Sequence, residues 1–255
     1  MIKLENYEVV GWEHAIRGMR NPMNSWEKSD SFFGESKEDV YEAGCYIKSC
    51  DDCAHKDQDT CLPEYTNWGV PAIGPNNRDL MMRLANGGPV HAKYRRMITV
   101  YVDITAPLYW WKEFDTYKVG TVANSCSTMH KIHEKEFTLE DFSCEYLDML
   151  ETKRLHDDVV TNFNYVEPLN MILTALNCAR KMYLETKDKL YWWQMIQLLP
   201  SSYNQKRTVM LNYEVLAGIY KWRKNHKLDE WVDFCKFIES LPYSEIITGK
   251  GENDG

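Results

Sequence analysis

The sequence predicts an α+β protein with a mixed sheet and a helix-rich C-terminal half. Two observations indicate this class. Residues 97–105, MITVYVDIT, alternate apolar and polar side chains as a half-buried strand does, whereas apolar residues after residue 168 recur mainly at helical spacing. Because 255 residues can bury one sizeable core, we expect a single domain over residues 1–248 and a disordered tail over residues 249–255.

The first half should begin with a strand in IKLENYEVVGW (residues 2–12) and a short helix in EHAIRGMR (13–20) that ends at Asn21-Pro22. Asn77 is expected to cap a helix in RDLMMRLANGG, which Gly87 terminates. The strand at 97–105 follows, with one apolar face formed by Ile98, Val100, Val102 and Ile104.

Later elements are expected to be helical. Thr138 and Asp141 form a capping box before LEDFSCEYLDML, with Asp in place of the usual Glu. Apolar residues three and four apart then predict helices in residues 169–188, 189–200, 207–224 and 228–241. Arg223 lies near the last two of these helices. His226 and Glu230 are four residues apart and would share a helix face if the last helix began early enough, although a solvated helix end is the plainer interpretation.

Composition excludes several functions. The formal net charge of −8 argues against a nucleic-acid-binding protein, because phosphate backbones require a basic field. No apolar run reaches the roughly 18 residues of a membrane span, and the start MIKLENYEVV lacks the pattern of a signal peptide. We therefore expect a soluble, cytoplasmic protein.

Between about residues 28 and 75 the chain is polar, irregular and rich in cysteine, as in an insertion. Four cysteines crowd there at spacings x4, x2 and x7: Cys45, Cys50, Cys53 and Cys61. The first three match an iron–sulfur order, and four thiolates also suit a tetrahedral zinc ion. We expect a zinc site in preference to an iron–sulfur cluster. The alternative is a loop whose cysteines are free or paired in disulfides.

Residues 106–133 change abruptly from an aromatic helix, PLYWWKEF, to hydroxyl, amide and thiol side chains. The aromatic run is typical of a core. The polar run that follows is expected to be a loop, and it could cradle a phosphate through backbone N–H groups and hydroxyls.

The residues from His91 to Lys131 resemble the flavin-dependent thymidylate synthases. That family carries a histidine, a strand ending in Ala-Pro, an aromatic helix and the signature Arg-His-Arg-x2-Ser-x4-Ser-x-Arg. Here the corresponding positions are His91, Ala106-Pro107, Thr116-Tyr117-Lys118, Thr121, Cys126 and Thr128, or Ser127 and Met129 with one insertion. The later family residues correspond to Leu199-Pro200, Asn212, Arg223 and His226-x3-Glu230.

The resemblance implies a homotetramer that uses FAD, with NADPH and methylenetetrahydrofolate as co-substrates, to transfer one carbon to C5 of dUMP. It implies a catalytic role for Arg223, which would favour the ionised pyrimidine. It implies nucleotide binding by Glu113, Thr116, Thr121, Ser125, Cys126, Ser127, Thr128 and Arg223. It implies FAD binding by His91, Thr116, Tyr117, Lys118, Asn124 and Asn212.

The signature has lost positive charge, since only Lys118 remains of its three cationic or ionisable groups and Asp115 adds a negative one. Arg17, Arg95 or Arg96 could compensate. The alternative is a catalytically inactive or repurposed nucleotide-binding member of the same fold, with a metal-stabilised insertion.

Overall fold

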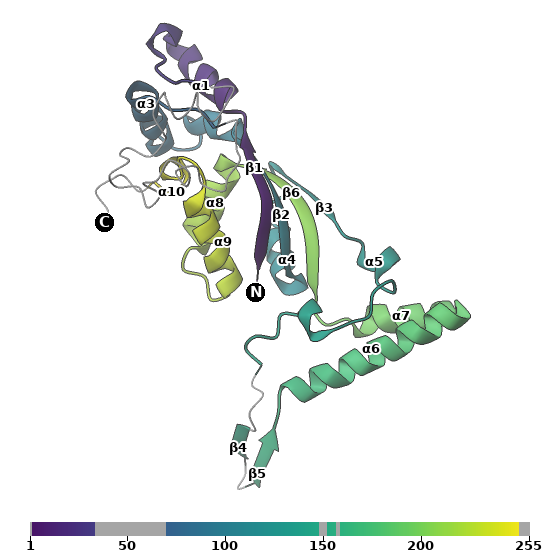
Figure 1. Ribbon diagram of the computed structural model, residues 1–255. Coiled ribbons are helices and arrows are strands. Elements are labelled where there is room, and N and C mark those ends of the chain that lie inside the picture. Colours follow the sequence, from purple (N-terminus) through teal and green to yellow (C-terminus); the bar gives the residue numbers. More distant parts are fainter. Residues whose placement is uncertain (1, 34–69, 148–151, 157–158, 250–255) are drawn as a thin grey trace, which may run out of the picture. The chain divides into compact units, whose positions relative to one another are not determined.

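The computed structural model describes residues 2–33, 70–147, 152–156 and 159–249, and only the backbone of residues 152–156 and 159–163. The chain divides into two compact units, which are described separately below (Figure 1). Unit 1 comprises Met1–Lys3, Ile104–Thr116 and Asn124–Arg207, and unit 2 comprises Leu4–Asp103, Tyr117–Ala123 and Thr208–Gly255.

The described elements confirm the α+β class. In chain order they are β1 (Lys3–Val10), α1 (Trp12–Arg20), the 3-10 turns η1 (Asn21–Met23) and η2 (Trp26–Lys28), α3 (Pro75–Asn86), η3 (Ala92–Arg96), β2 (Thr99–Pro107), α4 (Leu108–Phe114), β3 (Thr121–Ser125), α5 (Thr128–Lys131), η4 (Leu139–Asp141), β4 (Thr152–His156), β5 (Val159–Phe163), α6 (Val166–Thr186), α7 (Lys189–Leu198), β6 (Asn204–Asn212), α8 (Tyr213–Arg223), α9 (Asp229–Ser240) and α10 (Glu245–Thr248).

Four strands form one sheet in the order β1-β2-β6-β3, and the boundary between the units passes through all four strands. A second sheet pairs β4 with β5 in antiparallel register, from Thr152 opposite Phe163 to His156 opposite Val159. The alternating residues predicted on one face of β2 and just before it are all buried: Ile98, Val100, Val102 and Ile104.

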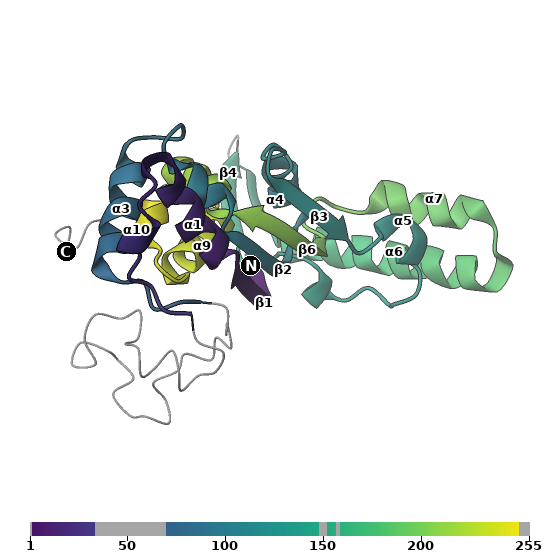
Figure 2. The same cartoon turned by 90° about the horizontal axis from the view of Figure 1, so that it is seen from above.

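The core of unit 2 lies among α1, α3, η3, α8, α9 and α10. Figure 2 shows α1, α3, α9 and α10 gathered together, and α10 contacts α3, α8 and α9. Trp12, at the start of α1, packs its buried ring edge-on against Tyr213 and Tyr243, with both pairs of centroids 5.4 Å apart. Aromatic pairs in this geometry stabilise a core beyond the area they bury, so the N-terminal helix is tied to the C-terminal ones.

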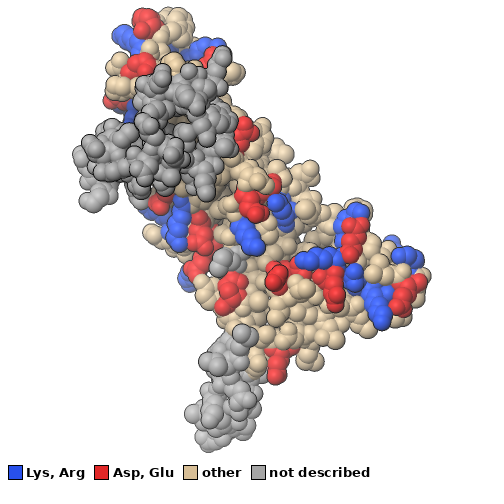
Figure 3. Space-filling view, in the orientation of Figure 1, with Lys and Arg blue, Asp and Glu red and all other residues tan. Residues whose placement is uncertain are grey.

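The core of unit 1 lies under the α6–α7 hairpin. Apolar residues of α6 at three- and four-residue spacing, Leu169, Leu173 and Leu176, pack with Met195 of α7 and with residues of the preceding segment. On the face seen in Figure 3, acidic and basic side chains are interspersed over this hairpin. None of the described helices combines the length and apolar character that crossing a bilayer requires.

The start of α3 differs from the sequence prediction. Asn77 does not cap the helix; it lies inside it, fully buried. The first-turn amides are satisfied instead by Asp30, whose carboxylate accepts from the backbone N–H of Asn76 at 2.7 Å and of Asn77 at 3.0 Å. A carboxylate at a helix N-terminus also meets the positive end of the dipole. Tertiary structure therefore supplies this cap from a residue 46 positions away.

Three further predictions were wrong in detail. Residues 207–212 belong to strand β6 rather than to a helix, with Val209 and Leu211 buried in alternation. The polar stretch expected as a loop is largely strand β3. The capping box of Thr138 and Asp141 is present, but it opens only the short turn η4 rather than a longer helix.

Candidate functional site

In unit 2, Arg223 lies at the C-terminal end of α8, where Tyr117, His226 and Trp231 contact its guanidinium. Its Nε donates to the Tyr117 hydroxyl at 3.0 Å, and its Nη1 donates to Nε2 of His226 at 2.9 Å. The guanidinium carbon lies 4.6 Å from the centroid of the Trp231 ring, within the range in which a ring face attracts a cation. Three residues singled out from the sequence, Arg223, Tyr117 and His226, therefore lie in one cluster.

His226 takes part in this cluster in an unexpected way. Helix α9 begins at Asp229, so His226 and Glu230 do not share a helix face. Because a guanidinium can only donate, Nε2 of His226 acts as the acceptor toward Arg223. The ring holds the guanidinium through one nitrogen, while its other nitrogen, Nδ1, lies 3.2 Å from the amide nitrogen of Leu228. Of the two contacts, the one to Arg223 is the shorter.

Asn212 has a structural role that limits what it can bind. It is the N-cap of α8, and its Oδ1 accepts from the backbone N–H groups of Glu214 and Val215, both at 3.1 Å. Its Nδ2 remains available and lies against Gly120, where a Cβ would come within 2.9 Å. Gly120 has a φ of +78°, so both its conformation and this close approach require glycine. Because Oδ1 is already used in the cap, the Nδ2 group is the part of the Asn212 side chain that can donate to a ligand.

Two neighbouring signature residues of unit 2 differ in exposure. Lys118 is exposed and forms no ion pair with the described residues. Thr121 begins β3, and its Oγ1 is buried without a hydrogen-bond partner in the described part of the chain. Such an atom is costly to leave unpaired, which makes Thr121 Oγ1 a polar atom able to contact a ligand.

The remaining signature residues belong to unit 1, around the end of α4, β3 and α5. The hydroxyl of Thr116 donates to the backbone carbonyl of Glu113 at 2.7 Å, closing the end of α4. Ser127 caps α5 by accepting from His130 N–H at 3.0 Å. The polar positions Asn124, Ser125 and Cys126 are exposed, whereas Glu113, Ser127 and Thr128 are half-buried. The Cys126 amide donates to Lys206 O at 2.9 Å.

Arg207 of unit 1 is a residue that the sequence analysis missed. Its guanidinium carbon lies 4.1 Å from the centroid of the Trp111 ring, and its Nη1 donates to Asp115 Oδ1 at 2.7 Å. Asp115 is therefore neutralised by an ion pair and does not add an unbalanced negative charge beside the signature. The available signal was an arginine among alternating apolar residues, which was assigned to a helix instead of a strand.

The predicted compensating arginines are not equivalent. Arg95 is buried, and its donors are already used within the protein. Its Nε donates to Glu214 at 2.8 Å, and its Nη1 donates to the Ile246 carbonyl at 3.0 Å. Arg17 is exposed and lies 3.9 Å from Glu13. Arg96 is exposed. Arg95 is thus unavailable to an anion unless its pair with Glu214 breaks.

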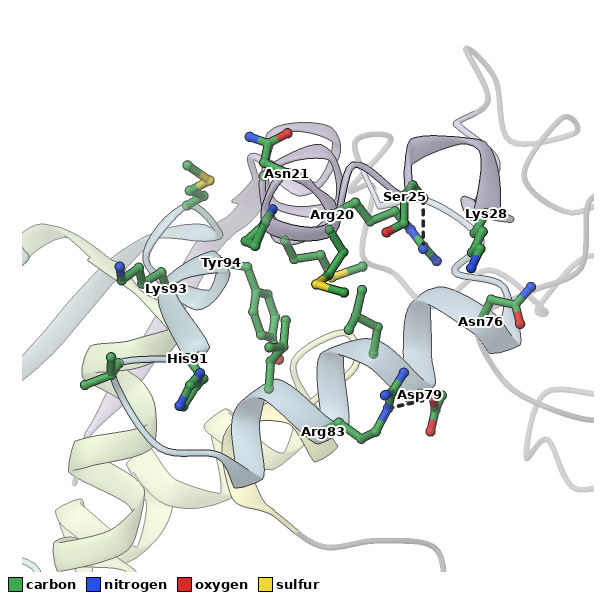
Figure 4. Close-up of a pocket in the computed structure, with 18 residues that line it drawn as sticks. Arg20, Asn21, Ser25, Lys28, Asn76, Asp79, Arg83, His91, Lys93 and Tyr94 are labelled. Atoms are coloured by element: carbon green, nitrogen blue, oxygen red, sulfur yellow. Dashed lines mark hydrogen bonds and ion pairs between the residues drawn. The ribbon is translucent and has the colours of Figure 1, made fainter.

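His91 lies on the wall of a cavity of about 1000 Å³ within unit 2, between α1, η1, η2, α3 and η3 (Figure 4). The cavity wall carries four cationic side chains, Arg20, Lys28, Arg83 and Lys93. Tyr94 closes one side, donating its hydroxyl to Met81 O at 2.8 Å. Burial raises the pKa of Tyr94 well above its usual range, so the phenol stays protonated. None of Arg20, Lys28, Arg83 and Lys93 was singled out from the sequence.

The predicted metal ligands, Cys45, Cys50, Cys53 and Cys61, lie outside the described residues. Within the part of the chain that the structure describes, no group of three or more His, Cys, Asp and Glu side chains is placed to hold a metal ion.

Solved structures share this fold. The thymidylate synthase ThyX from Helicobacter pylori with FAD and dUMP matches 96% of this chain and 94% of its own, at 16% identity and a TM-score of 0.55. Another structure of that flavin-dependent enzyme, also with FAD and dUMP, gives 15% identity and a TM-score of 0.54 over 96% of this chain and 95% of its own. The UMP/dUMP methylase PolB from Streptomyces cacaoi, bound with 5-Br dUMP, gives 13% and 0.52 over 98% of this chain and 95% of its own.

No family model and no curated protein matches the chain in sequence. At such low identity the structural likeness establishes the fold alone. The chain has the fold of the flavin-dependent thymidylate synthases, as its sequence predicts.

Proposed function

We propose that the protein is a flavin-dependent thymidylate synthase-like enzyme that transfers a one-carbon unit from methylenetetrahydrofolate to C5 of dUMP or a related pyrimidine nucleotide. The observation that carries the proposal is the Arg223 cluster, in which a cation is oriented by Tyr117, His226 and Trp231. The likeness of the fold to enzymes solved with FAD and dUMP supports it.

In this proposal Arg223 is the catalytic residue. A guanidinium held in advance stabilises negative charge that develops on a pyrimidine ring, because no reorganisation is needed when the charge appears. Tyr117 and His226 act as positioning residues, since each contacts the guanidinium and together they restrict its rotation. We also propose that the exposed polar positions of unit 1, Ser125 and Cys126, with Ser127 and Thr128 beside them, bind a nucleotide phosphate.

The residues of unit 2 fit a flavin nucleotide in two respects. Lys118 is exposed and forms no ion pair with the described residues, and Asn212 keeps its Nδ2 donor. When bound, FAD supplies the hydride that completes the methyl group, with NADPH as the reductant. Lys118 would bind a phosphate and Asn212 would donate one hydrogen bond, while His91 would contact the cofactor from the cavity wall. We also propose that the protein is a homotetramer.

A second candidate is a nucleotide-binding protein of this fold without methyl-transfer activity. Two observations favour it. Thr116-Tyr117-Lys118 replaces the Arg-His-Arg of the family signature, and Arg95 is paired with Glu214, so it does not replace the lost positive charge. Lysine does not replace the bidentate phosphate contact of arginine.

The test is an assay for dTMP with the full chain, FAD, NADPH, methylenetetrahydrofolate and dUMP, alongside binding of dUMP by calorimetry. Arg223→Ala should lower kcat on the order of 10²-fold, as removal of one preorganised donor does, with a much smaller change in dUMP affinity. Lys224→Ala, an exposed neighbour on the same helix end, is the matched control.

Three outcomes separate the candidates. Formation of dTMP with the expected Arg223→Ala effect supports the enzyme. Binding of dUMP or FAD without dTMP would favour the second candidate or another pyrimidine acceptor. Absence of dTMP, flavin retention and dUMP binding together would refute both.

A further inference from the structure

Gln205, in strand β6 of unit 1, is a buried amide that joins an arginine to a backbone carbonyl. Only 8% of the residue is exposed. Its Oε1 accepts from Arg207 Nε at 3.0 Å, and its Nε2 donates to the carbonyl oxygen of Cys126 at 2.9 Å. One end of the amide therefore reaches residues 125–128, which are called the polar segment below.

The Arg207 side chain decides which way this amide faces. A guanidinium has no acceptor, so the atom of Gln205 that faces it must be the oxygen. The amide nitrogen then faces the Cys126 carbonyl, which can only accept. A flipped amide would set donor against donor and acceptor against acceptor. The two neighbours therefore hold the amide in a single orientation.

Arg207 is itself fixed by helix α4 and its end. The guanidinium carbon lies 4.1 Å from the centroid of the Trp111 ring, and Nη1 donates to Asp115 Oδ1 at 2.7 Å. A planar guanidinium that is both stacked and ion-paired loses most of its freedom. Trp111 Nε1 also donates to the Gln205 carbonyl at 2.9 Å. Helix α4 thus fixes the main chain at Gln205 as well as the cation beside its amide.

The main chain of Cys126 is held at both of its polar atoms. Its N–H donates to Lys206 O at 2.9 Å, and its carbonyl accepts from Gln205 Nε2. The next residue, Ser127, accepts from the backbone N–H of His130 and caps α5. Of the two bonds at Cys126, only the one to the carbonyl comes from a side chain. A substitution at Gln205 can therefore release this carbonyl and leave the backbone bond to Lys206 in place.

We propose that Gln205 is the positioning residue of the polar segment and that Arg207 sets the orientation of its amide. By holding the Cys126 carbonyl, Gln205 fixes the backbone on which the exposed Ser125 and Cys126 side chains are carried. A segment that is ordered in advance costs less to bind a ligand. That the ligand is a nucleotide phosphate rests on the proposed function, whereas the effect of Gln205 on the backbone does not.

The first measurement is backbone hydrogen exchange by mass spectrometry, with the full chain and no ligand. Gln205→Glu keeps the size of the side chain and an oxygen toward Arg207, but it sets an acceptor against the Cys126 carbonyl. The neighbouring guanidinium keeps the new carboxyl ionised. The amides of residues 126–128 should exchange about tenfold faster than in the wild-type protein.

The matched control is Asn204→Ala, in the same strand and the same unit. It removes the hydrogen bond that Ser143 Oγ donates to Asn204 Oδ1 at 2.9 Å. This variant should lower Tm, because it also loses one side-chain hydrogen bond of β6. Exchange in residues 126–128 should stay at the wild-type rate.

The second measurement is dUMP binding by calorimetry, together with steady-state kinetics where dTMP forms. Gln205→Glu should weaken dUMP affinity about tenfold and raise KM by a similar factor, with little change in kcat, because it affects binding and leaves the reacting ring untouched. Arg223→Ala should give the opposite split, with a lower kcat. Asn204→Ala should change neither constant, which separates positioning from general damage to the fold.

Two further variants test how the network acts. Gln205→Met removes the donor without adding charge, so a loss of affinity in it cannot come from repulsion between a new carboxylate and a phosphate. It carries the same expectations if Gln205→Glu fails to fold. Arg207→Met should also weaken dUMP binding. Added to Gln205→Met, it should cost less than about twofold more, because Arg207 acts through Gln205.

The outcomes separate this inference from the proposed function. Wild-type exchange rates in both Gln205 variants would overturn the positioning role, whether or not a nucleotide binds. Faster exchange with an unaltered dUMP affinity would overturn it as well, because the polar segment would then not hold the nucleotide. Faster exchange in the Gln205 variants of a protein that binds no dUMP even as wild type supports the positioning role and refutes the proposed function alone.

Discussion

The hydroxyl of Tyr117 accepts a hydrogen bond from Nε of Arg223 at 3.0 Å, although the two residues are 106 positions apart. Tyr117 stands where the resembling family has histidine in its signature. A phenol at this position accepts a hydrogen bond from the arginine, but unlike an imidazole it cannot carry positive charge. This contact leads to the first prediction.

Tyr117→Phe should remove one restraint on Arg223 while keeping the aromatic ring. We expect the free energy of unfolding to fall by about 1.5–3 kcal/mol, the usual range for a hydrogen bond involving a charged group. If Arg223 is catalytic, kcat should fall about tenfold with little change in dUMP affinity. Urea unfolding and steady-state kinetics measure the two effects. An unchanged kcat in an active enzyme would show that the hydroxyl does not position Arg223.

Lys118→Ala should chiefly weaken retention of FAD, because Lys118 is the last cation of the degraded signature and forms no ion pair with the described residues. The measurement is the FAD content after gel filtration and the Kd from fluorescence. Lys112→Ala, at another exposed lysine, is the control. Equal retention by the Lys118→Ala variant and the wild-type protein would remove Lys118 from the cofactor site.

Asp30→Ala should destabilise unit 2, because the carboxylate satisfies two first-turn amides of α3. The expected loss is about 1–2 kcal/mol, the upper part of the range for helix caps. Asp30→Asn should lose less, since its amide oxygen can still accept one of the two bonds. Urea unfolding decides the point, and equal stability of all three proteins would contradict the capping role.

The stability of unit 2 should depend on Cys235 at alkaline pH. This thiol is 3% exposed, and burial raises its pKa from 9.0 to about 11. The folded state thus holds the proton more tightly than the unfolded state. The resulting stabilisation is complete below about pH 9 and is lost as pH rises toward about 11.

Cys235→Ala should therefore reduce the fall in unfolding free energy between pH 9 and 11, by about 2 kcal/mol at most. In the folded wild-type protein at pH 8, iodoacetamide should label exposed Cys126 and Cys178 while sparing Cys235. Rapid labelling of Cys235 without denaturant would be inconsistent with a buried, protonated thiol.

The four clustered cysteines, which lie outside the described residues, are proposed to hold one zinc ion. Elemental analysis of protein purified without added metal should give about one equivalent, because four thiolates form a closed tetrahedral site. Removal with a chelator should lower Tm, since metal binding contributes to folding. Less than about 0.2 equivalents of zinc or iron, with four freely titrating thiols, would reject the site.

Local periodicity in the sequence determined much of this protein. The α+β class followed from patterns that each lie within one continuous segment. These are the alternation in residues 97–105, the helical spacing in α6, α7 and α9, and the aromatic helix α4. The spacing of Asn212 and Arg223 after Leu199-Pro200 likewise pointed to the family fold.

Tertiary structure decided what depends on distant partners. Residues 207–212 have a pattern that a helix could also use, and pairing with neighbouring strands made them β6. Asp30 displaced Asn77 as the cap of α3, which left Asn77 inside the helix and facing Arg20. No local pattern reports that Arg20 is buried beside neutral acceptors, or that Arg207 neutralises Asp115, because burial and charge pairing arise only when separate segments meet.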